Sequence, residues 1–163
     1  MKFQISKINL FKCLTHLQGI VDKKNTLPIL SNILIEAKDN SLILSSTDMD
    51  ISIIEKLDCN VLEDGSTTIN SQMFYDVVRK LDDNCDLEVI SNNGKILTLR
   101  ASGSRFSLAC LPKEDFPIID KQNKGVNINV NSSILFKLID KTRFAISNEE
   151  TRYFLNGLYF NVF

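Results

Sequence analysis

The sequence contains few of the residues that mark disorder, collagen-like repeats or metal binding. Among its 163 residues there are 6 glycines, 3 prolines, one histidine and no tryptophan. With 44% hydrophobic and 24% charged residues, the composition is that of a folded protein and excludes a disordered or linker-rich chain. The cysteines are widely spaced, with no CxxC pair and no nearby histidine, so we expect small buried apolar side chains at Cys13, Cys59, Cys85 and Cys110.

Long apolar runs and a dominant charge are also missing. No stretch approaches the roughly 20 apolar residues of a membrane span, and the opening MKFQISKINLF lacks the apolar core and cleavage site of a secretory signal. We therefore expect a cytoplasmic protein with no membrane partner. The net charge of -1 excludes a chain that coats nucleic acid by bulk charge, so any DNA contact must come from a local basic patch.

An internal repeat organises the chain. Shifting the sequence by 125 residues places Phe3, Ile5, Leu10, Phe11, Lys12 and Leu14 over Ile128, Val130, Leu135, Phe136, Lys137 and Ile139. A shift of 64 residues places Ile5, Leu10, Phe11, Leu14 and Leu17 over Ile69, Phe74, Tyr75, Val78 and Leu81. One basic unit therefore occurs three times, and a repeat of this kind decides the fold.

Each copy predicts a short strand, then a Ser or Asn that can cap a helix, then apolar residues at helical spacing. Extended runs rich in Ile, Leu, Val and Thr follow the helices at 29–37, 41–45, 51–59, 87–90, 96–101 and 106–111. Polar turn signals separate them at 39–40, 63–65 and 92–94. The pattern predicts an α+β fold, with two helices packed on antiparallel sheets.

The same pattern predicts the domain organisation. Two units form a first domain over residues 1–120, a polar linker covers 112–125, and residues 126–163 are the incomplete start of a second domain. A strand and a helix without their remaining sheet expose apolar surface, so we expect the natural protein to be longer than this chain.

Enzymatic motifs are scarce. His16 has no acidic residue three or four positions away, which leaves it a solvated helix residue rather than half of a catalytic pair. Asp48 and Asp50 lie two residues apart and favour a strand-end turn, with metal binding or acid/base catalysis as the alternative. We expect no catalytic residue, no metal and no cofactor.

Positive charge is concentrated at the start of the chain. Residues 1–25 contain five lysines against Asp22, a net charge of +4, whereas the remaining 138 residues sum to -5. The helix of the third copy is also basic, with Lys137, Lys141 and Arg143 against Asp140. If the repeated helices line one surface, that surface can meet phosphates without reading sequence.

Several local segments occur together in one order. They are the opening MKF, TLPILSNILI at 26–35, STDMD at 46–50, SRFSLACLP at 104–112, DFP at 115–117 and RYFLNGLYF at 152–160. In order and spacing they resemble the bacterial sliding clamp family, the beta subunit of DNA polymerase III, over the whole chain. The resemblance implies a DNA-clamp fold of repeated β-α-β-β-β units with helices on one face of antiparallel sheets.

The family resemblance also implies a function. A head-to-tail ring of two three-domain subunits encircles duplex DNA, with helices lining the hole, and tethers the polymerase as a non-catalytic subunit of a DNA-directed DNA polymerase, which is a nucleotidyltransferase. The implied partners are double-stranded DNA, the replicative DNA polymerase, the clamp loader, and repair proteins that bind through short linear peptides. The full-length protein would be a homodimer.

The resemblance assigns residues to three surfaces. The DNA-binding positions are Lys23, Lys24, Gln72, Asn148, Glu149 and Tyr153. The subunit interface contains Met73, Val77, Arg105, Phe106 and Leu108, where an exposed strand edge can pair with another chain. Arg152 and Leu155 form one wall of an apolar pocket for partner peptides, whose remaining walls come from residues beyond Phe163.

Two other hypotheses remain open at this point. In the first, the chain is a clamp-like protein-interaction module, or an inactive truncated fragment, that does not encircle DNA. In the second it is an enzyme that uses Asp48 and Asp50 with a divalent metal. We favour the sliding clamp because a closed ring stays on DNA without a strongly basic surface, which fits a chain of net charge -1.

Overall fold

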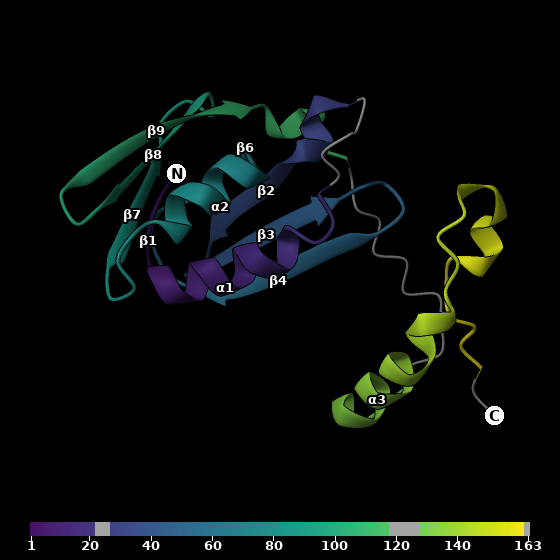
Figure 1. Ribbon diagram of the computed structural model, residues 1–163. Coiled ribbons are helices and arrows are strands. Elements are labelled where there is room, and N and C mark those ends of the chain that lie inside the picture. The colour runs from purple at the N-terminus through teal and green to yellow at the C-terminus, as the bar shows by residue number, and fades with distance from the viewer. Residues whose placement is uncertain (22–26, 118–127, 162–163) are drawn as a thin grey trace. The chain divides into compact units, whose positions relative to one another are not determined.

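The computed structural model describes residues 1–21, 27–117 and 128–161 (Figure 1). Lys23 and Lys24 lie outside the described residues. The chain divides into two compact units, Met1–Asp120 and Lys121–Phe163. Each unit is considered by itself below.

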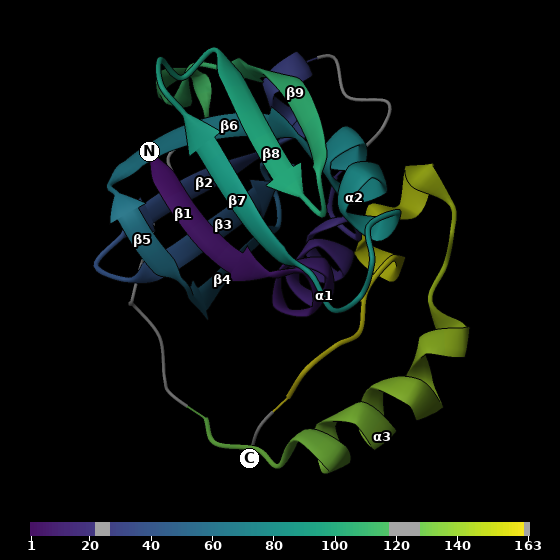
Figure 2. The ribbon, with the colours of Figure 1, turned by 90° about the vertical axis from the view of Figure 1, so that its left-hand side faces the viewer.

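The first unit is built on one antiparallel sheet. Its described residues contain nine strands in the order β4-β3-β2-β6-β9-β8-β7-β1-β5 (Figures 1 and 2). In chain order the strands are β1 Lys2–Ser6, β2 Asn32–Lys38, β3 Ser41–Thr47, β4 Ser52–Asp58, β5 Asn60–Glu63, β6 Gly65–Asn70, β7 Asp86–Ser91, β8 Ile96–Ala101 and β9 Ser104–Leu111. With two helices, this architecture confirms the predicted α+β fold.

The sheet order follows from the internal repeat. Strands β2, β3 and β4 form one meander and β7, β8 and β9 form its equivalent in the second copy. The first strand of each copy pairs with the meander of the other copy, β1 with β7 and β6 with β2. Neither copy completes its own sheet, so both are needed for one stable domain.

Two helices cover the sheet and pack against each other, α1 Lys7–Leu17 and α2 Ser71–Arg79. The predicted caps are confirmed, because the Ser6 hydroxyl and the Asn70 side-chain carbonyl accept hydrogen bonds from backbone N–H groups in the first helical turns. The largest fully buried side chains come from helices and strands alike, and include Phe3, Leu10, Leu14, Leu17, Ile33, Ile35, Leu44, Ile69, Phe74 and Leu87.

The repeat is visible in a side-chain contact as well. Phe11 and Tyr75 occupy equivalent positions in α1 and α2, and their rings stack with centroids 5.3 Å apart. Lys7 lies over the Phe11 ring and Arg79 over the Tyr75 ring, at 4.8 and 5.7 Å from the centroids. Equivalent aromatic residues of the two copies therefore meet where the helices cross.

Some local predictions for the first unit were wrong. The run predicted as a strand from residue 29 begins with a 3-10 helix, Pro28–Ser31, because proline favours a helical first turn. Strand β5 was missed. The Asp39-Asn40 turn was predicted correctly, with φ of 49° and 54°, and a second tight turn at Ser102-Gly103 was not predicted.

The cysteine prediction holds for one of the four residues. Cys13 is buried, whereas Cys59, Cys85 and Cys110 are partly exposed at the border of the core. All four lie within the described residues and are free thiols.

The first part of the segment predicted as a polar linker, residues 112–125, has regular structure. Residues Lys113–Asp115 form a 3-10 turn that follows β9, and Phe116 is buried, with 5% of its surface exposed. The first unit therefore continues through Phe116.

The second unit contains α3 Ser132–Thr142, capped by Asn131, and 3-10 turns at Arg143–Ala145 and Glu150–Leu155. The strand predicted before this helix is absent from residues 128–161. In the first unit the equivalent strand, β1, is held by pairing with β7 of the next copy, so a strand at this position depends on a partner from another copy. As predicted, large apolar side chains are exposed, among them Phe136, Phe144, Phe154, Tyr159 and Phe160.

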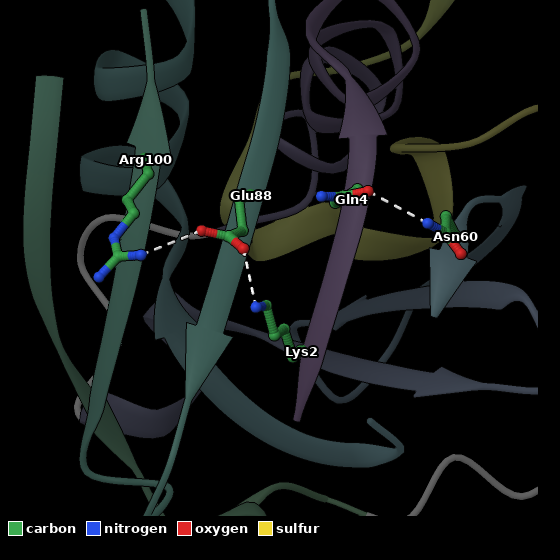
Figure 3. A network of polar contacts seen from close by, with 5 residues as sticks. All are labelled: Lys2, Gln4, Asn60, Glu88 and Arg100. Atoms are coloured by element: carbon green, nitrogen blue, oxygen red, sulfur yellow. Dashed lines mark hydrogen bonds and ion pairs between the residues drawn. The ribbon is translucent and has the colours of Figure 1, made fainter. Parts of the chain in front are cut away.

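A polar ladder crosses four strands of the first unit (Figure 3). Glu88 on β7 accepts from Lys2 on β1 at 2.9 Å and from Arg100 on β8 at 3.2 Å, and Asn60 on β5 donates to Gln4 at 3.1 Å. The hydrogen bond from Lys2, reinforced by the charges of Lys2 and Arg100, lowers the pKa of Glu88. Cross-strand pairs of this kind support sheet register.

We expect Glu88→Gln to lower the melting temperature at pH 7 by at most about 4 °C, since exposed ion pairs contribute little. A carboxylate whose pKa is lower in the folded state than in the unfolded state, where it is near 4.3, stabilises the fold at pH values above 4.3. This stabilisation is lost as the pH falls through the pKa of the folded state. The difference from the unsubstituted chain should therefore vanish toward pH 2.5 in calorimetry. Glu36→Gln is the control, because Glu36 is an exposed residue of β2 with no ion pair to a described residue. An equal effect there would contradict the role of the ladder.

Candidate functional site

The two acidic residues that suggested catalysis lie in a turn between β3 and β4. The Asp48 carboxylate accepts hydrogen bonds from the backbone N–H groups of Asp50 and Ile51, at 3.0 and 2.7 Å. Thr47 accepts from the N–H of Met49, which has a φ of 84°. The predicted strand-end turn is confirmed, and Asp48 serves to close it. In the described ranges, no group of three or more His, Cys, Asp or Glu side chains gathers to hold a metal.

His16 has an acidic partner that the local sequence did not reveal. Its Nδ1 lies 2.6 Å from Oε1 of Glu55, which comes from β4 and is 39 positions further along the chain. Cys13, one turn earlier on α1, also borders Glu55, and burial together with this carboxylate raises the pKa of the Cys13 thiol. The thiol stays protonated, so this group is no activated nucleophile.

Strand β9 has one free edge. Its residues 104–109 pair with β8 on one side, whereas on the other side β6 pairs only with Cys110 and Leu111. Among the described residues, no strand pairs with the second edge between 104 and 109. Unpaired N–H and C=O groups on such an edge are a template for a further strand.

An apolar hollow of about 610 Å³ lies beside this free edge. It contains Met73 and Val77 from α2 and Phe106 from β9, three of the residues predicted for the subunit interface. Met73 is 51% exposed, and Phe106 packs partly against the core. Gln72, predicted to contact DNA, borders the same hollow and donates to Asp76 at 2.9 Å.

The other two predicted interface residues lie elsewhere. The Leu108 side chain is in the core, 6% exposed, so only its backbone is available at the strand edge. Arg105 is exposed and borders a separate hollow of about 810 Å³ that also contains Arg100. The structure thus brings Met73, Val77 and Phe106 together without them.

The predicted site residues of the second unit lie near one another in sequence and structure. Arg152 forms an ion pair with Glu149 at 3.3 Å, and the backbone N–H of Ser147 donates to the carbonyl of Leu155 at 3.0 Å. Tyr153 is 80% exposed and meets Phe154 edge to face. Asn148 is exposed beside them.

Positive charge on α1 and α2 is partly neutralised. Lys7 is only 4% exposed and pairs with Asp83, and Arg79 pairs with Asp76 at 3.1 Å. Lys12 is exposed on α1 and forms no ion pair with any residue that the structure describes. The helix surface is therefore only mildly basic.

Residues 1–120 match the sequence model of a protein family, described as DNA polymerase III beta subunit, N-terminal domain. The chain belongs to this beta subunit family. It is 44% identical over 160 residues to the beta sliding clamp of Caulobacter vibrioides, covering 98% of this chain and 43% of that protein. A relative from Vibrio cholerae, also a beta sliding clamp, is 35% identical over 99% of this chain and 44% of its own length.

Solved structures agree with the family assignment. The C. crescentus beta sliding clamp superposes with a TM-score of 0.92 at 44% identity, over 98% of this chain and 43% of that one. A DNA polymerase III subunit beta from Bartonella birtlesii, solved with bound griselimycin, superposes with a TM-score of 0.94 at 37% identity. The match covers 99% of this chain and 43% of that one. The predicted resemblance and the predicted clamp fold are both confirmed.

The chain spans less than half of the length of the sliding clamps that it matches. No helix in the described residues is long and apolar enough to cross a membrane. The candidate functional features of the first unit are a free strand edge with an adjacent apolar hollow and a mildly basic pair of helices. A signal for Glu55 was present in the sequence, since an acid interrupts an alternating apolar row at Ile53 and Leu57.

Proposed function

We propose that this chain is the first domain and the start of the central domain of a sliding clamp, a processivity subunit that encircles duplex DNA. Residues 1–120 supply the N-terminal clamp domain, 112–125 contain the linker and 126–163 begin the next domain. The observation that carries the proposal is the match to beta sliding clamps over 98% of the chain with a TM-score of 0.92. The protein is non-catalytic and acts in the cytoplasm as part of the DNA-directed DNA polymerase holoenzyme.

The free edge of β9 supports ring closure. A strand from a second subunit would continue the sheet along residues 104–109, while the hollow at Met73, Val77 and Phe106 would receive apolar side chains. A head-to-tail arrangement of this kind closes into a ring when the rotation permits. In the full-length homodimer the interface would hold the ring shut.

The helices would face the DNA. Lys12 on α1 is exposed, and Lys23 and Lys24 follow the helix outside the described residues. With Gln72, Asn148, Glu149 and Tyr153 they would form a weakly charged lining. Weak phosphate contacts suit a ring that slides, because retention depends on closure of the ring rather than on affinity.

Partner peptides would bind at the second unit. The Bartonella birtlesii relative was solved with griselimycin, which supports a ligand pocket in this family. Arg152 and Leu155 would contribute one wall, and the replicative polymerase, the clamp loader and repair proteins would use it through short linear peptides. Leu155 is 44% exposed, which leaves its side chain available to a ligand.

The decisive experiment measures retention of the complete protein on circular DNA. After loading onto a nicked plasmid, the protein should co-elute with the DNA in gel filtration and leave it when the plasmid is linearised. Lys23→Glu with Lys24→Glu should lower the amount of protein loaded onto the plasmid several-fold through phosphate repulsion, whereas Lys38→Glu, exposed at the end of β2, is the control. Equal loss from circular and linear DNA would indicate a clamp-like interaction module instead.

A further inference from the structure

Glu55 occupies an unusual position in the first unit. Strand β4 alternates between exposed and partly buried residues, and Glu55 lies in the row between Ile53 and Leu57, which pack against the core. Its side chain is 26% exposed, and His16 and Cys13 of α1 lie next to it. A carboxylate in an apolar row requires partners, and the fold supplies the His16 ring with the Cys13 thiol beside it.

The contact determines which nitrogen of the His16 ring carries a proton. An ionised carboxylate only accepts hydrogen bonds, so at 2.6 Å from Glu55 the Nδ1 atom must be the donor. In the neutral ring, Nε2 is then left with a lone pair and no proton. Only the protonated ring donates from Nδ1 and Nε2 together.

His16 borders a groove with a basic residue. A hollow of about 490 Å³ runs along α1 and is lined by Lys7, Ile8, Phe11, Lys12, Thr15, His16 and Asp83. The His16 side chain is 50% exposed, and Lys12 lies one turn earlier on the same helix. The groove thus combines an exposed ammonium group with an exposed imidazole on one helix face.

The other charged groups near this face are largely neutralised within the described residues. Lys7 pairs with Asp83, and on α2 Arg79 pairs with Asp76. Strand β3 carries no titratable side chain, β1 contributes Lys2, which pairs with Glu88, and Cys13 is a protonated thiol. In the described part of the chain, Glu55 is the charged group in contact with His16, and Lys12 is an exposed cation in the same groove.

We propose that His16 is a proton-dependent contact for DNA phosphates and that Glu55 is its positioning residue. The inference rests on the proposed function, in which the helices face DNA. The neutral ring, held by Glu55, presents a lone pair to the phosphate and repels it. The protonated ring donates Nε2–H to a phosphate oxygen while Nδ1–H remains on Glu55. Phosphate binding at this position therefore takes up one proton, and affinity rises as pH falls.

The single histidine allows a direct test by NMR on the 163-residue chain. The ring Hε1 resonance of His16 is titrated from about pH 5 to pH 8.5 at low salt, with and without a duplex of about 20 base pairs. A tenfold preference of DNA for the protonated ring raises the titration midpoint by about 1 pH unit. Duplex affinity, from fluorescence anisotropy, should rise by about the same factor as pH falls.

Variants separate the proton-dependent contact from general charge. His16→Gln should abolish the rise in affinity at low pH. Lys12→Gln should weaken binding at every pH and leave the rise in place. Glu55→Gln retains an acceptor for Nδ1–H, so the displacement of the His16 midpoint by DNA should persist in this variant.

Two outcomes overturn the proposal in distinguishable ways. In the first, the duplex shifts the backbone amide resonances of α1 but leaves the titration midpoint of His16 unchanged. His16 then only pairs with Glu55, and the proposed contact between the helices and DNA is retained. If no α1 resonance moves and Lys12→Gln has no effect, the helices do not face DNA, and the proposed DNA surface fails together with the inference.

Discussion

Met73→Asp combined with Phe106→Ala is expected to convert the proposed dimer of the complete protein to a monomer. The two substitutions remove apolar contacts from the hollow beside β9 and place a carboxylate near Asp76 in the same hollow. A desolvated, unpaired charge costs several kcal/mol at an interface, so the dimerisation constant should weaken by at least about 100-fold. Analytical ultracentrifugation over a dilution series measures the change.

A matched control tests whether the position of the substitution matters. Ile8→Asp replaces an apolar residue of similar exposure, 54% against 51% for Met73, on the other helix. It should leave the dimer intact. If both variants dissociate equally, or if the Met73 and Phe106 variant stays dimeric with an unchanged melting profile, the interface lies elsewhere.

Much of the first unit could be predicted because the repeat carries structural information. The 64-residue offset paired Phe11 with Tyr75, and the structure stacks these two rings at 5.3 Å. The capping residues Ser6 and Asn70 followed from the start of each copy. The repeat could not show that the first strand of each copy pairs with the other copy, β1 with β7 and β6 with β2. Such pairing depends on contacts between residues that are distant in sequence.

Short elements and distant pairs escaped the sequence for related reasons. Strand β5 has four residues and is recognisable only by its pairing with β1. The His16 and Glu55 contact joins residues 39 positions apart, so a search for acids one helical turn away could not find it. The resemblance named five interface residues, of which Met73, Val77 and Phe106 line one hollow. It did not show that the Leu108 side chain lies in the core, because burial depends on the packed sheet.

The structure also predicts where the chain can be shortened. A chain of residues 1–120 should keep the full stability of the first unit and be more soluble than the 163-residue chain, because it lacks the exposed aromatic residues of the second unit, such as Phe144 and Tyr159. Solubility is measured by precipitation with ammonium sulfate, and stability by urea unfolding. Equal or lower solubility would contradict the placement of the boundary.

A second cut, placed before the predicted linker of residues 112–125, tests whether residues 112–120 belong to the first unit. Ending the chain at Leu111 removes Phe116, which is 5% exposed, and the 3-10 turn before it. Burying a phenylalanine side chain contributes about 2 kcal/mol, so the 1–111 chain should unfold at lower urea than the 1–120 chain. Phe116→Ala in the 1–120 chain should reproduce most of that loss, because the stabilisation comes from this one side chain and not from the length of the linker.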